Sequence, residues 1–412
     1  MKRLRFCFPT TFYPPYSFGG DGINVQRLAR ALVNRGHSVT VVHDVDAFEA
    51  LGGKAQYQVP ERDGVKVVCL RSGWGAISPL LTQQTGHPLG NSDELRRVLG
   101  SGEFDIINFH NISLLGGPGL LAYGNGVAKL YTAHEHWLVC PTHVLWRHLR
   151  EPCPARQCVR CQLVYKRPPQ LWRHTRLLQR NLHHVDQFLA FSEFSRNKHH
   201  EFGFPRDMMI VPALVPAPST DVKVTAKPGE GERPYFLFAG RLEKIKGLDD
   251  VIPVFRTYHD ADLIIAGDGE HAVELRRIAA GASNVRFVGR VDYSAMTRYY
   301  MGAVATLVPS VGFETFGSVA VESLAHGTPV IGRDQGGVGE ILRQSGGGEL
   351  FTHAATLPAA LHRLQNDSAH RSRCSDRGRE AYAARWSEGA VIPRYLEIVS
   401  NVLRRRGNCA PS

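Results

Sequence analysis

Short apolar runs that alternate with helix-forming stretches are the feature that most restricts the fold of this chain. Each run is a few residues long and is followed by a polar loop and then by an amphipathic stretch, such as 26–34, which ends before Gly36. Runs of this kind indicate βαβ units and therefore a parallel, doubly wound α/β sheet. The predicted strands are 4–8, 38–43, 104–110, 128–134 and 187–192, then 235–240, 261–267, 285–289, 305–310 and 328–332.

The two groups of strands are separated by a stretch rich in Pro, Gly and small polar residues, VPALVPAPSTDVKVTAKPGEGERP, at 211–234. A chain of 412 residues is too long for one core. We therefore predict an N-terminal domain over 1–215 and a C-terminal domain over 216–388. The segment 389–412 has helical periodicity and is predicted to cross back onto the first domain. In open α/β sheets ligands bind beyond the carboxyl ends of the strands, so a site is expected in a central cleft between the domains.

The composition excludes several classes of protein. Hydrophobic residues make up 43% of the chain and charged residues 21%, which is typical of a globular domain. No run of about 18 apolar residues is present, so no membrane span is predicted. The start, MKRLRFCFPTTFYPPYSFGG, reaches Pro and polar residues too soon for the apolar core of a signal peptide. We expect a cytoplasmic protein, in which eight cysteines favour a metal or free thiols over disulfides.

The formal net charge of +11 is concentrated in one segment. Between residues 140 and 180 the sequence has nine Lys or Arg and one acid, Glu151, a balance of +8. One interpretation is a solvated basic surface. The other is a face for an anionic partner: a phospholipid surface, a lipid phosphate, an acidic glycan or a nucleic acid. Trp146, Tyr165 and Trp172 interleave with the arginines, as in a surface that stacks bases, so a nucleic-acid-binding protein is a minor alternative.

Two glutamates bracket a predicted helix start in PSVGFETFGSVAVESLAHGTPVIG, residues 309–332. If the helix begins near Phe316 or Gly317, its free amides and the positive end of its dipole are available to a phosphate. Glu314 then lies just before these amides, where it can accept hydrogen bonds from sugar hydroxyls. Glu322 lies about two turns into the helix, where it can hold the vicinal hydroxyls of a ribose. The alternative is that Glu314 only stabilises the helix dipole and that Glu322 is a surface residue.

Glycine and basic residues follow other predicted strands of the second half. Gly240 and Arg241 end the strand 235–240, and Lys246 precedes a helix. Glycine lets a ligand approach the backbone, and the two cations, five residues apart, can clamp a diphosphate. Each loop taken alone is also explained as an ordinary turn. The further strand-end positions are Gly267, Arg290 and Val291.

Taken together, these motifs resemble the retaining glycosyltransferases of the GT-B fold, specifically the GT4 family. The family's hallmark is two glutamates separated by seven residues, here Glu314-Thr-Phe-Gly-Ser-Val-Ala-Val-Glu322. GRLEKIKG (240–247) resembles its phosphate loop, and RFVGRV and HGTPVIGRDQGGVGEIL match its usual sequence. The resemblance covers most of the chain. It implies two Rossmann-like domains that face a central cleft, and a nucleotide-sugar donor.

The resemblance also implies roles for individual residues. Glu322 would bind the ribose, Glu314 the donor sugar, and Arg241 with Lys246 the diphosphate, whose developing charge they would stabilise. One departure is visible, because Thr315 stands where the family usually has glycine, which leaves open which sugar hydroxyls are recognised. The predicted donor-binding set is Gly19, Gly20, Gly240, Arg241, Lys246, Gly267, Arg290, Val291, Glu314, Phe316, Gly317, Ser318, Val319 and Glu322.

In the first half, FYPPYSFGGDGINVQRLARALVNRGHSVTVV resembles the family's glycine loop and first helix, with Gly19-Gly20 near the transferred sugar or the acceptor. His110 and His134 each follow a predicted strand. A lone histidine is more often structural, but His134 matches a family histidine near the transferred sugar. Ser192 and Arg196 lie in SEFSR, which the family places at the domain junction. The predicted acceptor-side residues are His110, Ser192 and Arg196, and the predicted catalytic residues are Glu314, His134, Arg241 and Lys246.

No pair of carboxylates across the two domains suggests a double displacement. In the family, transfer is generally thought to occur on one face of the sugar, with the leaving diphosphate helping to deprotonate the acceptor hydroxyl. No catalytic metal or other cofactor is therefore expected for the reaction.

Four cysteines cluster within the basic segment, at Cys140, Cys153, Cys158 and Cys161, and the series ends in Cys-x-x-Cys. Four thiolates in so short a stretch suit tetrahedral zinc. Such a metal would hold together an insertion at about 138–180 that has little core of its own. We predict a structural zinc, with one or two disulfides, or reduced thiols, as the alternatives.

These observations predict a retaining hexosyltransferase that moves a sugar from a nucleotide sugar, with UDP favoured, to a hydroxyl acceptor. The basic insertion favours an acceptor that is anionic or membrane-associated, such as a polyprenyl-linked or polysaccharide intermediate, and a protein that is peripheral at the inner membrane face. A sugar-nucleotide epimerase or hydrolase of the same fold is the alternative, and it would turn over the donor without an acceptor.

Overall fold

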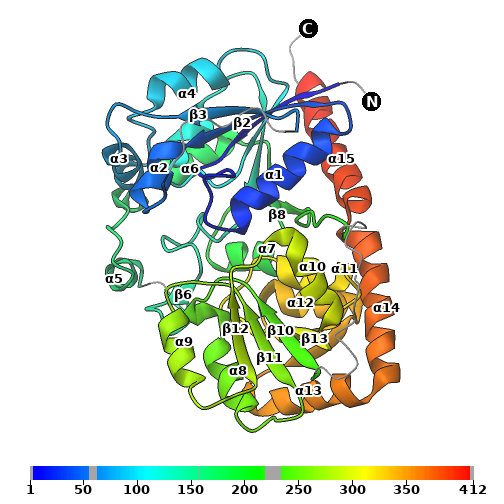
Figure 1. Cartoon of the computed structure of the whole chain (residues 1–412). Coiled ribbons are helices and arrows are strands. Elements are labelled where there is room, and N and C mark those ends of the chain that lie inside the picture. The colour runs from blue at the N-terminus through cyan, green and yellow to red at the C-terminus, as the bar shows by residue number, and fades with distance from the viewer. Residues whose placement is uncertain (1–2, 55–62, 156, 219–232, 409–412) are drawn as a thin grey trace.

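Two parallel β-sheets organise the chain, one in each half of the sequence (Figure 1). The computed structural model describes residues 3–54, 63–155, 157–218 and 233–408. The N-terminal sheet has the strand order β3-β2-β1-β4-β5-β8-β9, and the C-terminal sheet has the order β12-β11-β10-β13-β14-β15. Every strand pairing within these sheets is parallel. The predicted fold class, two doubly wound α/β sheets, is confirmed.

The N-terminal sheet consists of β1 (Arg5–Pro9), β2 (Ser38–Asp44), β3 (Lys66–Leu70), β4 (Ile106–Phe109), β5 (Ala128–Ala133), β8 (Gln187–Ala190) and β9 (Met208–Ile210). The C-terminal sheet consists of β10 (Tyr235–Ala239), β11 (Asp262–Ala266), β12 (Val285–Gly289), β13 (Ala305–Val308), β14 (Val330–Arg333) and β15 (Gly348–Phe351). A separate antiparallel hairpin is formed by β6 (Trp146–Arg147) and β7 (Glu151–Pro152).

The α-helices of the first half are α1 (Gly20–Val33), α2 (Val45–Ala50), α3 (Ile77–Thr85), α4 (Ser92–Leu99), α5 (Cys158–Val164), α6 (Leu177–Asn181) and α7 (Glu193–Glu201). Those of the second half are α8 (Leu248–Phe255), α9 (Ala272–Ile278), α10 (Tyr293–Gly302), α11 (Ser318–Ala325), α12 (Gly336–Ser345), α13 (Leu357–Asn366), α14 (Ser368–Arg385) and α15 (Glu388–Asn408). Short 3-10 turns are η1 (Pro118–Ala122), η2 (Leu171–His174), η3 (Leu182–His184), η4 (Lys244–Lys246) and η5 (Ala354–Thr356).

The strands are short apolar runs because both faces of each sheet are covered. In β1, Phe6 and Phe8 pack into one hydrophobic cluster, whereas Cys7 between them packs into another. Successive side chains of a strand point to opposite faces of its sheet. One strand therefore contributes to a core on each side, as the continuous apolar pattern indicates for a parallel sheet.

The first helix begins earlier than the sequence pattern indicates. We predicted a loop through Gly20 and a helix over 26–34, but α1 starts at Gly20. The sequence Gly20-Asp21-Gly22 has low helix propensity, which hides the start. Asp21 in the first turn is favourable at the positive end of the helix dipole. Gly22 is also required by packing, because a Cβ there would lie 2.6 Å from Ser17 Oγ.

The last two helices run along the side of both sheets (Figure 1). α14 packs on the C-terminal domain, where it contacts α11 and α12. α15 then packs on the N-terminal domain, because Ile392, Tyr395 and Val399 share one hydrophobic cluster with Phe6. The hydroxyl of Tyr395 accepts a hydrogen bond from Asn108 Nδ2 at 3.0 Å. The predicted linker 211–234 lies partly outside the described residues. Within those residues, no helix has the length and apolarity that a membrane span requires.

Candidate functional site at the domain junction

The loops that follow the strands of the two sheets contact each other, and we call this region the domain junction. Thr315 Oγ1 donates a hydrogen bond to the carbonyl of His134 at 2.8 Å. Ser192 Oγ donates to the carbonyl of Thr315 at 2.6 Å, and Arg27 pairs with Glu322 at 2.8 Å. Because the strands within each sheet are parallel, their carboxyl ends lie at one edge, where α/β proteins bind ligands.

Glu314 is held by two partners from its own domain. Its Oε1 accepts hydrogen bonds from Lys246 Nζ at 2.6 Å and from Ser310 Oγ at 2.8 Å. Burial alone would raise the pKa of Glu314, but the ammonium of Lys246 more than offsets burial and lowers it. Burial would likewise lower the pKa of Lys246, and Glu314 raises it. Both groups are therefore charged at neutral pH, and Lys246 remains a cation that an incoming phosphate could bind.

Glu322 forms an ion pair with the other domain. Its Oε1 accepts from Nη2 of Arg27, on α1, at 2.8 Å, and the two side chains are 14% and 11% exposed. Its Oε2 accepts from the hydroxyl of Tyr300 at 3.2 Å. The guanidinium of Arg27 also lies over the ring of Tyr293, 5.4 Å from its centroid. The alternative that Glu322 is a surface helix residue is therefore wrong.

Gly19 and Arg241 approach each other across the junction. A Cβ built on Gly19 would lie 4.0 Å from Arg241 Nη1 and 3.8 Å from Asp21 Oδ1. Gly20 follows as the first residue of α1. Arg241 pairs with Glu243 but keeps 57% of its side chain exposed. Its guanidinium thus lies beside the start of α1 and is accessible to an anionic ligand.

Gly240 and Gly267 follow the neighbouring strands β10 and β11. Their φ angles are +153° and +150°, and a Cβ on Gly267 would lie 1.8 Å from the carbonyl oxygen of Gly240. The close packing of the two strand ends therefore requires glycine at 267, whatever binds there. Arg290 and Val291 follow β12, where Arg290 is exposed and Val291 packs near Tyr300.

Helix α11 begins at Ser318, one or two residues after the predicted start. Its N-cap, Gly317, has φ +116°, a conformation that favours glycine. No side chain caps this end, so the first amides of the helix, including that of Val319, have no capping side chain as acceptor. Phe316 is buried, and its ring lies 6.1 Å from that of Phe191 in the other domain. Contact of Phe316 with a donor would therefore involve its backbone.

His110 and His134 form a buried pair. His110 Nδ1 lies 2.8 Å from His134 Nε2, and the other nitrogen of each ring has no partner among the described residues. Burial lowers the pKa of His134 to about 4 and that of His110 well below its usual value. Both rings are therefore neutral at pH 7. They line a small cavity of about 30 Å³, which also contacts Asn24 and Phe191.

Ser192 and Thr315 fasten the two domains together. Ser192 Oγ caps α7 by accepting from the amide of Ser195 at 3.0 Å, while its hydroxyl donates to Thr315. Thr315, at the position where glycine is usual in similar sequences, uses its hydroxyl to bind His134 across the junction. Arg196 is half-buried on α7, and its Nε donates to Asn197 Oδ1 at 3.4 Å.

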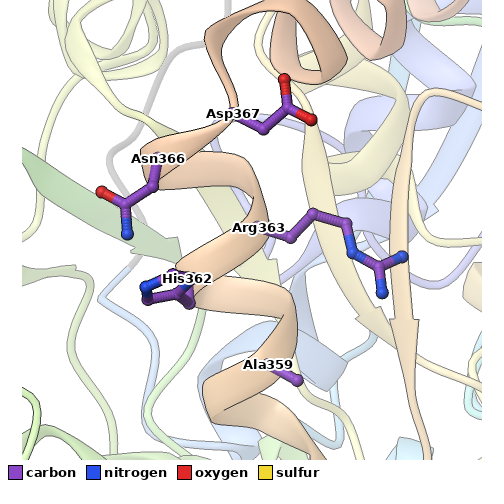
Figure 2. A pocket seen from close by; sticks show the side chains of 5 residues that line it. All are labelled: Ala359, His362, Arg363, Asn366 and Asp367. Atoms are coloured by element: carbon purple, nitrogen blue, oxygen red, sulfur yellow. The ribbon is translucent and has the colours of Figure 1, made fainter.

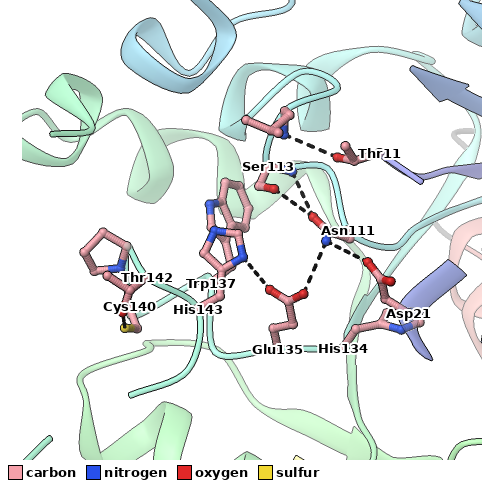
Figure 3. A network of polar contacts seen from close by, with 12 residues as sticks. Thr11, Asp21, Asn111, Ser113, His134, Glu135, Trp137, Cys140, Thr142 and His143 are labelled. Atoms are coloured by element: carbon pink, nitrogen blue, oxygen red, sulfur yellow. Dashed lines mark hydrogen bonds and ion pairs between the residues drawn. The ribbon is translucent and has the colours of Figure 1, made fainter. Parts of the chain in front are cut away.

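A polar network that sequence reasoning missed lies on the N-terminal side of the junction (Figure 3). Asn111 Nδ2 donates to Asp21 Oδ2 at 3.0 Å and to Glu135 Oε1 at 3.4 Å, and His143 Nδ1 contacts the other oxygen of Glu135. Burial and the charge of Glu135 raise the pKa of Asp21. Burial would raise the pKa of Glu135 too, but His143 lowers it. Asp21 and Glu135, whose pKa values are shifted in opposite directions, thus both accept hydrogen bonds from the amide of Asn111.

A positional signal could have identified this network. Asp21 follows Gly20, Asn111 follows His110, and Glu135 follows His134 in the sequence. The strands that precede these three positions, β1, β4 and β5, are neighbours in the sheet. Polar residues just after adjacent parallel strands are expected to meet. This rule applies to Asn111 and Glu135, whereas Asp21 lies well beyond the end of β1 at Pro9, in the first turn of α1.

The four clustered cysteines lie near one another in the insertion. Cys140 and Cys161 are buried, and Cys153 and Cys158 are half-buried. Burial raises the pKa of Cys153 to about 11, and the other three thiols act on it electrostatically in the same direction. Within the described part of the chain, no three or more His, Cys, Asp or Glu side chains are already placed to hold a metal ion. The zinc site therefore stays a prediction.

A shallow hollow along α13, of about 520 Å³, lies outside this site. It is lined by Ala359, His362, Arg363, Asn366 and Asp367 (Figure 2). Figure 2 shows these side chains on different sides of the helix, and the Arg363 guanidinium pairs with Glu349. None of the predicted site residues lines it. The polar groups do not converge on one point, so the hollow has no arrangement typical of a ligand site.

Comparison with known families gives two matches that together cover most of the chain. The family model described as "Glycosyltransferase Family 4" matches residues 18–216. The model described as "Glycosyl transferases group 1" matches residues 222–381. The two matches therefore correspond to the N-terminal and C-terminal sheets, with the domain junction between them.

Curated proteins and solved structures give the same result. A phosphatidyl-myo-inositol mannosyltransferase of Mycobacterium leprae is 26% identical over 407 residues, which is 95% of this chain and 94% of that protein. A sucrose-phosphate synthase from Thermosynechococcus elongatus has a similar structure, with a TM-score of 0.73 at 19% identity over 98% of this chain and all of that one. Anabaena HepE, solved in complex with UDP, gives a TM-score of 0.68 at 16% identity over 97% and 100%.

Proposed function

Because this chain belongs to the group 1, GT4-type glycosyltransferases and has their GT-B fold, we propose that it transfers a sugar from a UDP-sugar to a lipid-linked or polysaccharide hydroxyl, with retention of configuration. Glycosyl transfer from a nucleotide sugar is the activity of the family. The identity of the base, the class of the acceptor and the retention of configuration are our proposals for this chain.

The placement of Glu314 and Glu322 carries the donor proposal. Both carboxylates lie at the domain junction, and each has a cation beside it, Lys246 for Glu314 and Arg27 for Glu322. A diphosphate would bind Lys246 and Arg241, which releases Glu314 to accept hydrogen bonds from the donor sugar. The ribose hydroxyls would take the place of Arg27 on Glu322. UDP is favoured because HepE, a structural neighbour, was solved with UDP.

The proposed reaction needs charge stabilisation more than a protein nucleophile. As the bond between the sugar and the diphosphate breaks, negative charge develops on the phosphate oxygens. The ammonium of Lys246, the guanidinium of Arg241 and the free amides at the start of α11 stabilise that charge. The acceptor hydroxyl then attacks from the face on which the diphosphate leaves, and its proton passes to a diphosphate oxygen.

We place the acceptor hydroxyl beside Asp21, Asn111 and Glu135. Asp21 lies next to Gly19, which itself lies beside Arg241, and Asn111 connects Asp21 to Glu135, so this network begins at the border of the predicted diphosphate site. Carboxylate and amide oxygens accept hydrogen bonds, so this side suits the neutral hydroxyls of a sugar or polyol. A lipid-linked acceptor is supported by the name of the mycobacterial relative, which has phosphatidyl-myo-inositol in it.

A thermal-shift panel of UDP-, GDP- and ADP-sugars tests the donor proposal. A ligand at about a hundred times its Kd stabilises the folded state by about 2.7 kcal/mol. We expect a UDP-sugar to raise the Tm of the wild type but not that of Glu322→Gln. Glu340→Gln is the matched control, because Glu340 also joins the domains, by accepting from the amides of Glu193 and Phe194, but outside the donor set. No shift with any nucleotide sugar would contradict the proposal.

We also propose that the four clustered thiols bind one structural zinc ion. Four neighbouring cysteines that end in Cys-x-x-Cys at the start of α5 are a chemically suitable donor set. Metal analysis of the purified protein should find about one zinc per chain. Cys153→Ser should lose it, whereas Cys374→Ser, a cysteine of the other domain, should retain it. Metal-free wild-type protein would refute the site.

A further inference from the structure

Exposed apolar side chains gather on one side of the N-terminal domain, on α3 and on the insertion. On α3, Ile77 is 59% and Leu80 48% exposed, and Trp74 just before the helix is 51% exposed. On the insertion, Leu163 of α5 is 62% and Leu171 60% exposed. Isolated exposed apolar residues are common on any protein, but a group of them indicates an interaction surface.

These two elements are in direct contact. The carbonyl of Pro168 accepts hydrogen bonds from Gln83 Nε2 of α3 at 2.8 Å and from Gln162 Nε2 of α5 at 3.2 Å. η2, which begins at Leu171, also contacts α3. Figure 1 shows α3 and α5 both at the left edge of the molecule, with α5 below α3. We therefore treat Trp74, Ile77, Leu80, Val159, Leu163, Val164 and Leu171 as one surface, which we call the α3–α5 face.

Helical spacing points the apolar residues outward. Ile77 and Leu80 are three residues apart and lie on one face of α3, while Ser78 and Thr82 on its other side are buried. Val159 and Leu163 are four residues apart on α5, and the buried residues of that helix are Cys161 and Gln162. The apolar side chains are therefore not part of either core.

The segments that form the α3–α5 face carry charge of one sign. No Asp or Glu occurs in residues 72–92 or 152–185. Among the described residues, the exposed Lys and Arg of the insertion are Arg150, Arg160, Lys166, Arg167, Arg176 and Arg180. An apolar surface whose own segments carry cations and no acid is complementary to an anionic partner that has an apolar interior.

A nucleic acid fits these observations less well than a lipid surface. Binding to single strands uses exposed aromatic rings as stacking platforms. Trp146 and Trp172 are only 5% and 4% exposed, and the guanidinium of Arg173 lies over the ring of Trp172. Tyr165 donates its hydroxyl hydrogen bond to the carbonyl of Trp146. Of the seven exposed apolar side chains of the α3–α5 face, six are aliphatic and only Trp74 is aromatic. A single exposed ring offers little stacking surface, whereas aliphatic side chains with one Trp are typical of interfacial membrane helices.

We propose that the α3–α5 face docks on the surface of an anionic lipid bilayer, with its aliphatic side chains in the interface and its cations on the lipid headgroups. The inference deepens the proposed function, on which its biological meaning rests, because docking would present a membrane-borne acceptor to the domain junction. The insertion connects the two places, since its His143 contacts Glu135 and its Arg173 donates to the carbonyl of Trp137.

Co-sedimentation with vesicles tests the proposal on the full-length protein. The wild type should bind phosphatidylcholine vesicles that contain about one third phosphatidylglycerol, and binding should weaken as salt rises. It should bind pure phosphatidylcholine vesicles far less. The double variant Ile77→Ser/Leu163→Ser should lose at least about tenfold in partitioning, and Lys166→Glu/Arg167→Glu a similar factor.

Matched controls separate this surface from exposure or charge in general. Val273 is 81% exposed on α9 of the other domain, so Val273→Ser should leave vesicle binding unchanged. Arg404→Glu at the end of α15 is the control for charge. Equal losses in the controls, or no binding of the wild type to anionic vesicles, would overturn the proposal. An oligonucleotide that displaced the vesicles and required Lys166 and Arg167 would reassign the face to nucleic acid.

Failure of this inference can be distinguished from failure of the proposed function. The α3–α5 face lies outside the donor set, so Ile77→Ser/Leu163→Ser should keep the Tm shift that a UDP-sugar causes. If the protein bound anionic vesicles but no nucleotide sugar raised its Tm, the docking proposal would be supported and the donor proposal contradicted. If a nucleotide sugar raised the Tm but the protein did not bind vesicles, the donor proposal would be supported and the docking proposal contradicted.

Discussion

The carboxylates on the two sides of the domain junction have different partners. On the C-terminal side, Glu314 and Glu322 each have a permanent cation, Lys246 and Arg27, within 2.8 Å. On the N-terminal side, Asp21 and Glu135 both accept hydrogen bonds from the amide of Asn111. The imidazole of His143 contacts the second carboxylate oxygen of Glu135.

This difference corresponds to two kinds of ligand. A diphosphate is an anion, and it needs cations that can exchange a carboxylate partner for a phosphate. An acceptor hydroxyl is neutral, and it needs hydrogen-bond acceptors without a competing positive charge. This difference underlies our proposal that the C-terminal side holds the leaving group and the N-terminal side the attacking hydroxyl.

Removal of Lys246 should have the largest effect on the reaction. Lys246→Ala removes a cation from the proposed diphosphate site and leaves the half-buried Glu314 without its partner. Loss of one such charge-stabilising group typically lowers kcat by about a hundredfold to a thousandfold. Initial rates of transfer measure the effect. Lys244→Ala changes an exposed lysine of the same 3-10 turn and should keep the wild-type rate. Equal rates for the two variants would place the diphosphate elsewhere.

The ion pair between the domains should make the largest contribution to stability. Arg27→Ala leaves Glu322 largely buried without its cation, which we expect to cost about 3 kcal/mol of the free energy of unfolding. Arg30→Ala on the same helix removes a pair with Asp63 in which both side chains are about half exposed, so it should cost less than about 1 kcal/mol. Denaturant unfolding compares the two. If both variants unfold alike, the Arg27–Glu322 pair does not couple the domains.

Glu135→Gln should separate the two sides of the junction. The change keeps the shape of the side chain and removes its charge, so a donor site made by the C-terminal domain should be unaffected. We expect UDP to raise the Tm of Glu135→Gln as it does for the wild type, while Glu314→Gln responds less. The comparison would fail if Glu135→Gln lost the nucleotide response, because Glu135 would then belong to the donor side.

The buried histidines should give the smallest effect, seen as a pH dependence. The pKa of His134 is lowered to about 4, below its unfolded value of about 6.5. Its contribution to stability is therefore complete above about pH 6.5 and is lost as the pH falls towards 4. By linkage, one such group costs roughly 2 kcal/mol between pH 7 and pH 5. Unfolding at the two pH values should show a smaller loss in His134→Gln than in the wild type, and an equal loss would exclude this histidine as a source.

Much of the C-terminal side could be predicted because its parts lie in one domain at fixed spacing. Lys246 and Glu314 follow strands of one parallel sheet, so the strand-end rule brings their loops together, and they meet at 2.6 Å. The pairing of Arg27 with Glu322 could not be predicted in this way, because the two residues are 295 positions apart and belong to different domains.

The N-terminal side was harder to predict for two local reasons. The sequence Gly20-Asp21-Gly22 is typical of a loop, so it does not indicate that Asp21 is in the first turn of α1. Asn111 and Glu135 directly follow His110 and His134 in the sequence. Because a histidine just after a strand suggests a functional group, we predicted functional roles for the two histidines and not for their neighbours. The structure instead pairs His110 with His134 in a buried position. Of their neighbours, Asn111 is buried as well, whereas the side chain of Glu135 is 32% exposed.

The sequence by itself determined the two parallel sheets and the strand-end loops that carry the residues of the proposed donor motif, because apolar periodicity and turn residues act locally along the chain. Only the tertiary structure decided the partners: Arg27 for Glu322, Thr315 for His134, and one amide for Asp21 and Glu135. An ion pair or a hydrogen bond forms over a few ångströms between atoms whose separation depends on how distant segments pack. No local pattern in the sequence specifies that separation.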